Sequence, residues 1–517
     1  MNRTTAIALC CGLAASLLAS AQPFNNVYGL NGDETAYGIA ETRDGGTVTV
    51  GTIRDASTAA PPDILVVKYD PAGNIVWSSR FGGPGNDIGW SIQQTTDGGY
   101  IIGAETDSQG PLTNLALLRL DPVGGYMWSW VYEGDTSLED LVLTDGVGVG
   151  VRQTQQGTYV LTGRKRQSDT NQMGVLIHAA PAGNPIWNFR YGDARVQERT
   201  RLTFTDVKVD RENTFYVSGT EIVQPAVGGP SNTNPVMFRI NGAGGVIFAR
   251  EYITAIPNIA TPETGTGDGL DIFRDGTIVM DGRSDLATTG TTNIHAIRTD
   301  PAGIPLWYRT YLRYNSSYRT CREDFDGRVA MAGQFGPPNS TDALLLVADL
   351  GTGMPLFARG YNFLPDALGM VPTRLIDGYA LTGPVNLPAS TGYGMRDIEQ
   401  IRTGPAGFVG CLDWPLDPQQ TQVAMSAPQF PTFVQSQVGT FWQGQFRRVT
   451  LREAELCRPC PPCAADFNND GGIDGADVND FFDAWGAGVP CADVNNDGGI
   501  DGADVQHFFT VWQNGGC

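Results

Sequence analysis

The feature of this 517-residue sequence that most constrains its fold is an internal repeat of about 50 to 60 residues. Each copy holds a turn followed by an apolar run that ends in glycine, as in "DGGTVTVG" and "DGGYIIG". These runs end at Gly51, Gly103, Gly163, Gly219, Gly282, Gly333 and Gly383. A second landmark such as "DPAGNIVW" follows in phase and ends at Trp77, Trp128, Trp187, Phe248, Trp307, Phe357 and Phe408. Two landmarks that recur seven times in one order predict seven structural units.

Each unit contains about four strand-sized runs separated by Gly, Pro, Asp and Asn turn signals. Four antiparallel strands per repeat are typical of a propeller blade, and one blade cannot bury both of its faces alone. The sequence therefore predicts a mainly β fold, with a seven-bladed β-propeller over residues 22–417. We expect the Trp or Phe landmark to fill the space between neighbouring blades, and Phe24 to Gly29 to complete the last blade. A tandem of β-sandwiches and an open solenoid are the alternatives.

The repeats resemble those of secreted bacterial proteins whose blades carry "DGGY-I-x-G" and "DxxGNxxW" motifs. The resemblance covers most of the chain, but its motifs are structural. It therefore implies a fold and not an activity.

Charge and composition limit the partners of the chain. The formal net charge is −21, so nucleic acid and anionic membrane surfaces are not expected partners. Sixty-six glycines and only 17% charged residues suit many short strands joined by turns. Lysine is almost absent, so nearly all positive charge is arginine.

Residues 1–21 have the pattern of a secretory signal peptide. Arg3 is followed by an apolar stretch from Ala6 to Leu18 and by an A-x-A site that ends at Ala21. That stretch is too short for a membrane span, and no later segment is long enough, so we expect no transmembrane segment in the mature chain. The sequence thus predicts a bacterial protein that is secreted or lies on the cell surface.

A connecting segment with a Cys- and Pro-rich linker is predicted for residues 418–462, where "CRPCPPC" stands out. Seven cysteines follow the signal peptide: Cys321, Cys411, Cys457, Cys460, Cys463, Cys491 and Cys517. In an exported chain most should form disulfides, although the spacing around Cys460 also allows zinc. The odd number leaves one thiol over, for which Cys517 is the candidate.

Two nearly identical loops, "DFNNDGGIDGAD" and "DVNNDGGIDGAD", lie within residues 463–517. Oxygen-bearing groups at loop positions 1, 3, 5, 7, 9 and 12 suit Ca²⁺, which takes six to eight oxygen ligands. The predicted ligands of the two ions are Asp466, Asn468, Asp470, Gly472, Asp474, Asp477, Asp493, Asn495, Asp497, Gly499, Asp501 and Asp504. Apolar residues at i, i+3, i+4 and i+7 after each loop predict two helices: Val478, Phe481, Phe482 and Trp485, then Val505, Phe508, Phe509 and Trp512. We expect these stripes to form a shared core.

Asp in place of Glu at position 12, with no helix before the loop, resembles dockerins more than EF-hands. The resemblance implies a small α-helical domain with two calcium loop-helix motifs, and a cohesin-like partner. Gly-Ala at the usual recognition positions and the terminal "NGGC" are similar to a GC-type dockerin anchor, which implies attachment to a cell-envelope protein.

No sequence motif of a hydrolase, metalloprotease or nucleotide-binding enzyme is present. Asp33 and Asp87 precede corresponding strands, where we interpret them as turn caps. The first functional hypothesis is a propeller that binds a carbohydrate or protein ligand and is attached by its calcium-binding tail. The alternative is a polysaccharide-acting enzyme carried by a dockerin, with paired carboxylates in the central funnel.

Overall fold

The computed structural model describes most of the chain between residues 23 and 514. The described ranges are 23–30, 32–55, 60–110, 112–132, 149–168, 171–193, 199–224, 231–254, 264–286, 291–312, 317–335, 342–361, 367–374, 377–385, 396–409, 413–415, 419–422, 425–426, 432–436, 440–442, 445–448, 452–457, 463–467, 472–487, 490–492, 494–495 and 500–514. The predicted signal peptide lies outside them. Within them the chain is mainly β, and its α-helices lie at the C-terminal end.

Antiparallel four-stranded units follow one another along the chain, as the repeat predicts. The first consists of β2 (Asp33–Glu41), β3 (Thr47–Arg54), β4 (Asp63–Tyr69) and β5 (Ile75–Gly82), hydrogen-bonded in that order. Gly45, at φ 80°, forms the turn before β3, where a positive φ favours glycine. The second unit consists of β6 (Asp87–Gln94), β7 (Tyr100–Thr106), β8 (Asn114–Leu120) and β9 (Tyr126–Tyr132), and the third of β10 (Val151–Gln153), β11 (Tyr159–Ser168), β12 (Asn171–Ala179) and β13 (Pro185–Asp193). The fourth consists of β14 (Arg199–Val209), β15 (Phe215–Gln224), β16 (Asn232–Ile240) and β17 (Val246–Glu251). The fifth consists of β20 (Gly269–Ile272), β21 (Ile278–Leu286), β22 (Thr291–Thr299) and β23 (Pro305–Leu312), and β19 (Thr264–Gly265) also pairs with β21.

The first strand of the described chain, β1, and the last repeat meet in one sheet. A sixth unit contains β24 (Ser317–Glu323), β25 (Val329–Phe335), β26 (Asp342–Ala348) and β27 (Pro355–Tyr361). The last contains β28 (Gly369–Thr373), β29 (Gly378–Val385) and β30 (Asp397–Thr403), and its fourth strand is β1 (Phe24–Gly29). Val27 pairs with Glu399 in this antiparallel ladder. The prediction that the N-terminal strand completes the last unit is confirmed.

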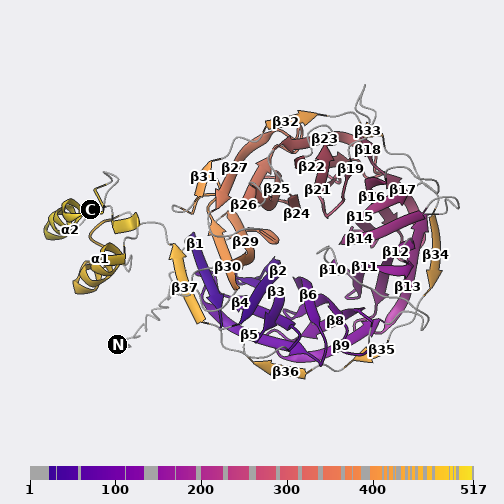
Figure 1. Ribbon diagram of the computed structural model, residues 1–517, viewed down its shortest axis with the longest axis horizontal. Helices are drawn as coiled ribbons and strands as arrows, with labels where there is room; N and C mark the ends of the chain where they lie inside the picture. The colour runs from indigo at the N-terminus through magenta and orange to yellow at the C-terminus, as the bar shows by residue number, and fades with distance from the viewer. Residues whose placement is uncertain are drawn as a thin grey trace, which may run out of the picture.

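The first strands of the units contact one another in a continuous sequence: β2, β6, β10, β14, β20, β24, β28 and again β2. Figure 1 shows these strands on the inside of a ring of sheets. The hydrophobic core lies between neighbouring sheets, because one cluster joins Val48 and Ile64 of the first unit to Ile102 and Leu118 of the second. No single sheet buries both of its faces without its neighbours.

Six of the seven aromatic landmarks pack against the next unit in sequence, as expected. The prediction for Phe408 was wrong, because that side chain is 50% exposed. Phe24 of β1 takes the landmark position of the last sheet and lies against Gly73 of the first unit, because β1 supplies the fourth strand there. Gly124, at φ 74°, lies so close to the Trp77 ring that an added Cβ would meet it at 2.6 Å. In most units a tyrosine lies four residues after the landmark aromatic residue. Its hydroxyl group donates a hydrogen bond to the carbonyl oxygen of the positive-φ turn glycine in the next unit. The donor and acceptor pairs are Tyr28 and Gly73 (2.6 Å), Tyr132 and Gly183 (2.6 Å), Tyr191 and Gly244 (2.9 Å), Tyr252 and Gly303 (3.0 Å), Tyr311 and Gly353 (2.8 Å), and Tyr361 and Gly407 (2.7 Å). At the remaining interface Phe81 replaces the tyrosine, and Ser79 Oγ donates to the Gly124 carbonyl at 3.2 Å.

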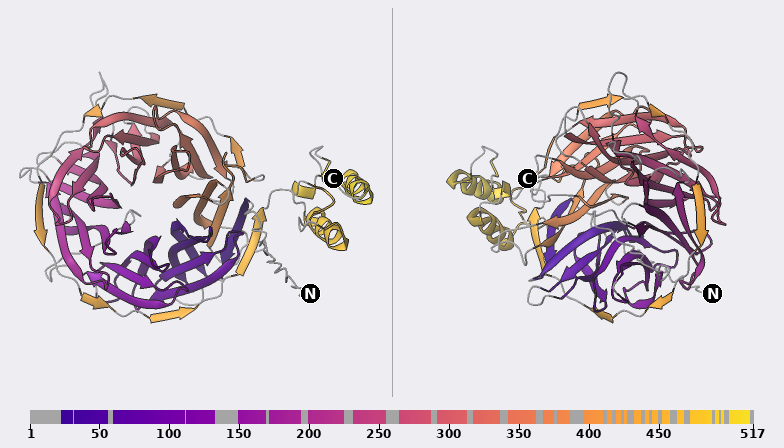
Figure 2. Two further views of the ribbon diagram at one scale, coloured as in Figure 1. Left: turned by 180° about the vertical axis from the view of Figure 1, so that it is seen from behind. Right: turned by 45° about the vertical axis from the view of Figure 1, so that its right-hand side comes forward.

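Short strands from the C-terminal part of the chain add an outermost strand to six of the seven units, and one more, β33 (Met425–Ser426), forms a separate two-stranded sheet with β18 (Ile253–Thr254). They are β31 (Asp413–Pro415), β32 (Gln419–Gln422), β33, β34 (Thr432–Ser436), β35 (Thr440–Trp442), β36 (Gln445–Arg448) and β37 (Arg452–Cys457). Their partners, in the same order, are β27, β23, β18, β13, β9, β5 and β1. The segment from β31 to β37, called the belt below, therefore runs round the rim in the reverse direction to the repeats (Figures 1 and 2). The sequence predicted a connecting segment over residues 418–462, with a strand-like stretch from Thr440 to Leu451 that matched no blade and in which β35 and β36 lie.

After the belt come α1 (Gly475–Ala487), the 3₁₀ helix η1 (Pro490–Ala492) and α2 (Gly502–Gln513). Figure 1 shows them outside the ring of sheets. None of the helices in the described part of the chain is long and apolar enough to cross a membrane.

Candidate calcium module

The two C-terminal helices pack on each other through aromatic rings. Phe481 and Phe508 are fully buried and stack with ring centroids 4.2 Å apart and planes 8° apart. Ala492 is buried beside them, and Phe467 approaches both rings edge-on. The helices after the two loops, and a core built from their apolar stripes, are confirmed.

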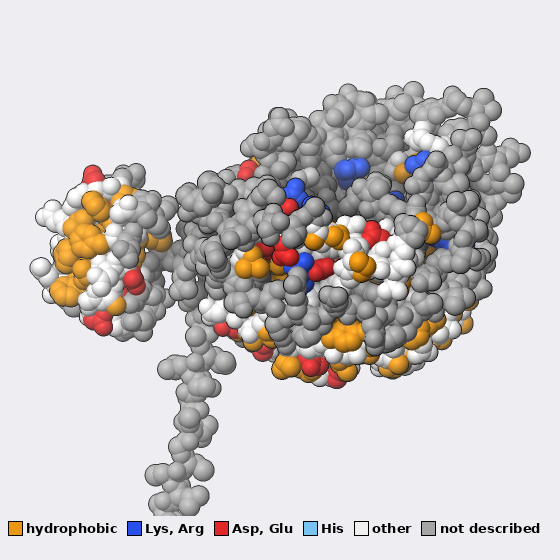
Figure 3. All heavy atoms as spheres, turned by 60° about the horizontal axis from the view of Figure 1, so that its bottom comes forward, with side chains coloured by type: hydrophobic (Ala, Val, Ile, Leu, Met, Phe, Trp, Pro, Cys, Tyr) orange, Lys and Arg blue, Asp and Glu red, His pale blue; other side chains and the backbone are white. Residues whose placement is uncertain are grey.

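Not all of the predicted stripe is core. Phe482 remains 40% exposed, and its ring lies 6.1 Å from that of Phe509. Trp485 is partly buried, and its indole N–H donates to the Asp501 carbonyl at 3.0 Å. Figure 3 shows hydrophobic side chains gathered on this small part of the molecule.

The last residue of each loop is a buried carboxylate that turns back toward its own loop. Asp477 and Asp504 are both 0% exposed. The Asp474 N–H donates to Asp477 Oδ2 at 2.8 Å, and the Asp501 N–H donates to Asp504 Oδ2 at 2.8 Å. In the second loop the Asn495 N–H also donates to Asp504 Oδ1, at 3.3 Å. The two halves thus place the residue at position 12 in the same way.

The residues at position 9 cap the helices. Asp474 Oδ1 accepts from the Ala476 N–H at 2.8 Å, and Asp501 Oδ1 accepts from the Ala503 N–H at 2.7 Å. Asp501 and Asp504 form a reciprocal capping box at the start of α2. An anionic side chain at a helix N-terminus is favourable, so these aspartates stabilise the helices whether or not a cation is bound.

The structure covers only part of each predicted ligand set. Asp466, Gly472, Asp474, Asp477, Asn495, Asp501 and Asp504 are described, whereas Asn468, Asp470, Asp493, Asp497 and Gly499 lie outside the described residues. Among the described residues, no three His, Cys, Asp or Glu side chains come together as a metal-binding group. The described ligands are thus Asp466, Gly472, Asp474 and Asp477 of the first loop and Asn495, Asp501 and Asp504 of the second, and calcium stays a prediction.

Two of the predicted disulfide cysteines are bonded. Cys463 and Cys491 each take part in a disulfide. Cys321 is a free, fully buried thiol in the ring of sheets, which the sequence did not single out. With Cys321 free, six of the cysteines after residue 21 are left, and an even number no longer requires Cys517 to be the unpaired one.

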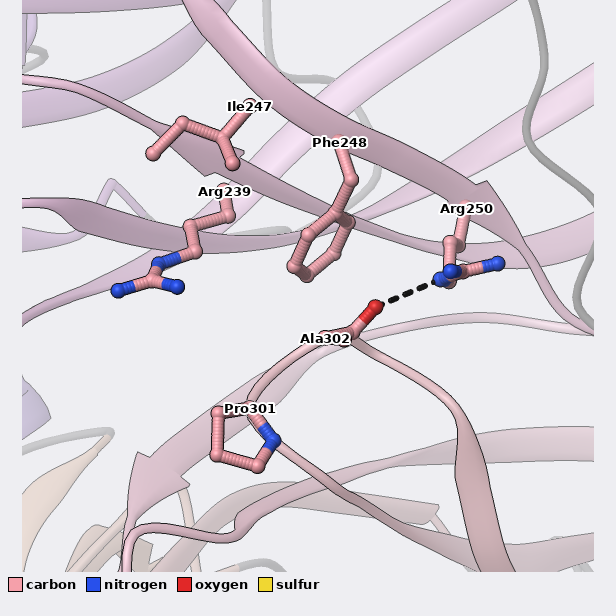
Figure 4. Close-up of a pocket in the computed structure, with 6 residues that line it drawn as sticks. All are labelled: Arg239, Ile247, Phe248, Arg250, Pro301 and Ala302. Carbon is pink, nitrogen blue, oxygen red and sulfur yellow. Dashed lines mark hydrogen bonds between the residues drawn. The ribbon is translucent and has the colours of Figure 1, made fainter.

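A surface pocket of about 340 Å³ lies between two neighbouring units (Figure 4). It is lined by Arg239, Ile247, Phe248, Arg250, Pro301 and Ala302. Arg250 Nε donates to the Ala302 carbonyl at 2.8 Å, and Arg239 lies over a tyrosine ring and bonds Asp210 at 3.0 Å. Phe248 stands where four other units carry tryptophan and where Phe357 stands in the sixth unit. We assign no ligand to this pocket.

Comparisons with known proteins leave the family open. No family model matches the chain, and no curated protein does. Among solved structures, a Dyadobacter fermentans DSM 18053 protein of unknown function is 11% identical, with a TM-score of 0.36 over 74% of this chain and 99% of that one. The tail fibre of Staphylococcus aureus phage P68 is 8% identical, with a TM-score of 0.17 over 63% and 94%. A GH43_12 protein retrieved from the capybara gut metagenome is 9% identical, with a TM-score of 0.19 over 79% and 99%. These similarities are too low to support an argument about function.

Proposed function

We propose that this chain is an exported, seven-bladed β-propeller that binds a carbohydrate or protein ligand and is attached through a calcium-dependent, dockerin-like tail. The circuit of contacts from β2 round to β28 and back to β2 supports the closed ring. The pairing of β1 with β30 supports the same closure, because it leaves no open edge between the chain ends. The belt supplies the outermost strand of six blades, and its strand β33 pairs with β18, which follows the remaining blade in the chain.

One observation carries the proposal for the tail: Asp477 and Asp504 are fully buried carboxylates held in the same way at the ends of two nearly identical loops. Burying an ionised carboxylate is costly unless it is paired with a cation or bonded by donors. The backbone N–H groups bonded to these carboxylates offset part of that cost, and a bound cation would offset more. Asp477 and Asp504 would each bind one Ca²⁺, with the oxygen-bearing residues of the same loop.

Calcium titration of the full-length protein by isothermal calorimetry tests this part. We expect two Ca²⁺ per chain, and one per chain for either Asp477→Asn or Asp504→Asn. Asp480→Asn is the matched control, because Asp480 is an exposed residue of α1 outside the loop. Absence of calcium-dependent heat in the wild type, or two bound ions in both loop variants, would contradict the proposal.

The partner of the tail would be a cohesin-like or cell-envelope anchoring protein. The exposed Phe482 offers it apolar contact area. Capture of envelope proteins by the full chain should require Ca²⁺ and should weaken in Phe482→Ser. Capture that is equal with calcium and with chelator would count against attachment through the calcium loops.

The polysaccharide-acting alternative is less well supported. Burial raises the pKa of Glu34 and Asp281 to about 7 and that of Asp87 to about 6, but all three side chains are 0% exposed. The described acidic residues Asp206 and Asp271, on inner strands, are both paired with Lys208. A glycosidase needs one carboxyl group with a raised pKa as its general acid. Burial alone would raise the pKa of Asp206, but Lys208, Arg152 and Arg322 lower it below its usual range.

A further inference from the structure

Charged side chains from four successive inner strands converge on one point inside the ring of sheets. They are Arg152 from β10, Asp206 and Lys208 from β14, Asp271 from β20 and Arg322 from β24, called the axial cluster below. Their side chains are 11–22% exposed. On the face shown in Figure 3, Lys and Arg side chains lie beside Asp and Glu side chains in the hollowed middle of the ring.

Asp206 is the centre of the axial cluster. Lys208 Nζ lies 2.7 Å from Asp206 Oδ2, an Arg152 guanidinium nitrogen 3.3 Å from Oδ1, and an Arg322 nitrogen 3.8 Å from Oδ2. Arg322 belongs to a unit two positions further round the ring, so its approach to Asp206 brings the cations together across the inner strands. Asp271 is 3.8 Å from Lys208 and also accepts the Glu323 N–H at 2.9 Å.

Two cations of the axial cluster, Lys208 and Arg152, are not fully compensated. Burial, followed by the charges of Arg152 and Arg322, lowers the pKa of Lys208 to about 8, against the opposing effects of Asp206 and Asp271. The pKa of Arg152 is also lowered, first by burial, with Arg322 acting in the same direction. Burial also acts to lower the pKa of Arg322, but Asp206 and Asp271 outweigh it, and that pKa is raised. Burial and then Asp268 raise the pKa of Asp281 to about 7, so at pH 7 this carboxyl group carries only part of a negative charge. Like charges are thus held together at a cost in stability.

Such a cost is unusual in this chain, which has only three lysines. Lys68 has no second cation among its described contacts: it pairs with Asp44 at 3.0 Å and donates to the Tyr69 carbonyl. In the axial cluster, by contrast, a lysine and two arginines share two carboxylates, those of Asp206 and Asp271. Folding alone does not require three cations at one point, and electrostatic strain of this kind tends to gather at functional sites.

We propose that the axial cluster binds an oxyanion, namely a carboxylate, sulfate or phosphate group of the propeller's ligand. This inference rests on the ligand-binding part of the proposed function and gives that ligand a chemical class. Arginine guanidinium groups present several N–H donors in a planar fork that suits such anions. Arg322 donates one described hydrogen bond, to the Cys321 carbonyl at 2.7 Å, and lies beyond hydrogen-bond distance of Asp206. Its guanidinium therefore has donor capacity for a ligand, and an entering anion would relieve the repulsion among the cations.

Denaturation of the full-length protein with added anions tests the site. Sodium galacturonate, sulfate and phosphate are compared with chloride at equal ionic strength and pH 7. At least one oxyanion should raise the unfolding midpoint in a saturable way, because a ligand that binds the folded state stabilises it. Arg322→Gln should weaken that affinity about tenfold or more, since it loses a charge-assisted contact. Arg374→Gln, at a side chain 78% exposed, is the matched control and should leave the affinity unchanged.

A second measurement needs no variant of the cluster. With lysine labelled at the side-chain nitrogen, the wild type gives only three amine signals, and titration follows each one. The oxyanion should raise the pKa of Lys208 above about 8 and leave the other two lysines unshifted. Failure of all three oxyanions to exceed chloride, or equal affinities in Arg322→Gln and Arg374→Gln, would overturn the proposal. Calcium binding by the tail is measured separately, so its result does not depend on this one.

Discussion

The buried carboxyl group of Glu105 should make the stability of the ring of sheets fall as pH rises. Glu105 is 2% exposed on β7, and burial raises its pKa from 4.5 to about 8, against opposing effects of Trp90 and Arg164. The folded state therefore holds this proton more tightly than the unfolded state does. The stability that Glu105 contributes is complete below pH 4.5 and is lost progressively as pH rises to about 8.

The size of the effect follows from linkage. Each pH unit inside the window costs about 1.4 kcal/mol, which gives about 2.5 kcal/mol between pH 5.5 and pH 7.5. Glu105→Gln keeps the shape and removes the titration, so the difference in unfolding free energy between variant and wild type should grow by about that amount over the same range. Urea denaturation followed by fluorescence measures it at fixed calcium concentration.

Glu212→Gln is the control, because the Glu212 side chain is 77% exposed and its removal should change stability little at either pH. The comparison with wild type cancels every other group that titrates in the window. Curves of stability against pH that run parallel in wild type and Glu105→Gln would refute the reasoning.

Three further predictions concern the contacts between sheets. Tyr191→Phe removes the donor to the buried Gly244 carbonyl and should lower the unfolding free energy by about 1–3 kcal/mol in urea, whereas an unchanged midpoint would show that the bond contributes nothing. Gly124→Ala places a Cβ against the Trp77 ring at positive φ and should cost about 1–3 kcal/mol by the same assay; a neutral result would mean that the turn can move away. Deleting residues 413–517 exposes the edge strands beneath the belt and should give oligomers by light scattering, while deletion of 458–517 alone should leave a monomer; monomers in both would exclude an edge-covering role.

Local patterns predicted much of the fold. The repeated glycine and tryptophan landmarks predicted the successive four-stranded units, and the apolar spacing around Phe481 and Phe508 predicted α1 and α2. The belt escaped prediction because strands of only two to six residues are too short to show a period, and each pairs with a strand far away in the chain.

The axial cluster could not be predicted from the sequence either, because its members, like the pairs formed by the belt, lie far apart in the chain. Its residues come from four different repeats, and no motif joins them before the strands are placed in space. The prediction that Asp33 and Asp87 lie at corresponding positions was wrong by one residue, because Glu34 makes the contact that corresponds to that of Asp87. Glu34 accepts the Leu30 N–H as Asp87 accepts the Gly83 N–H, each from four positions earlier.

The belt also determines how a mechanical load would enter the molecule. Tension applied through the C-terminal module reaches β37 first, where the belt pairs with the N-terminal strand β1. The next strands, β36 and β35, lie on other sheets, so each short ladder would be loaded only after the one before it had detached. An attached molecule pulled by its tail would therefore lengthen by releasing the belt in steps. The inner strands, and the axial cluster that they carry, would stay in place until the last step.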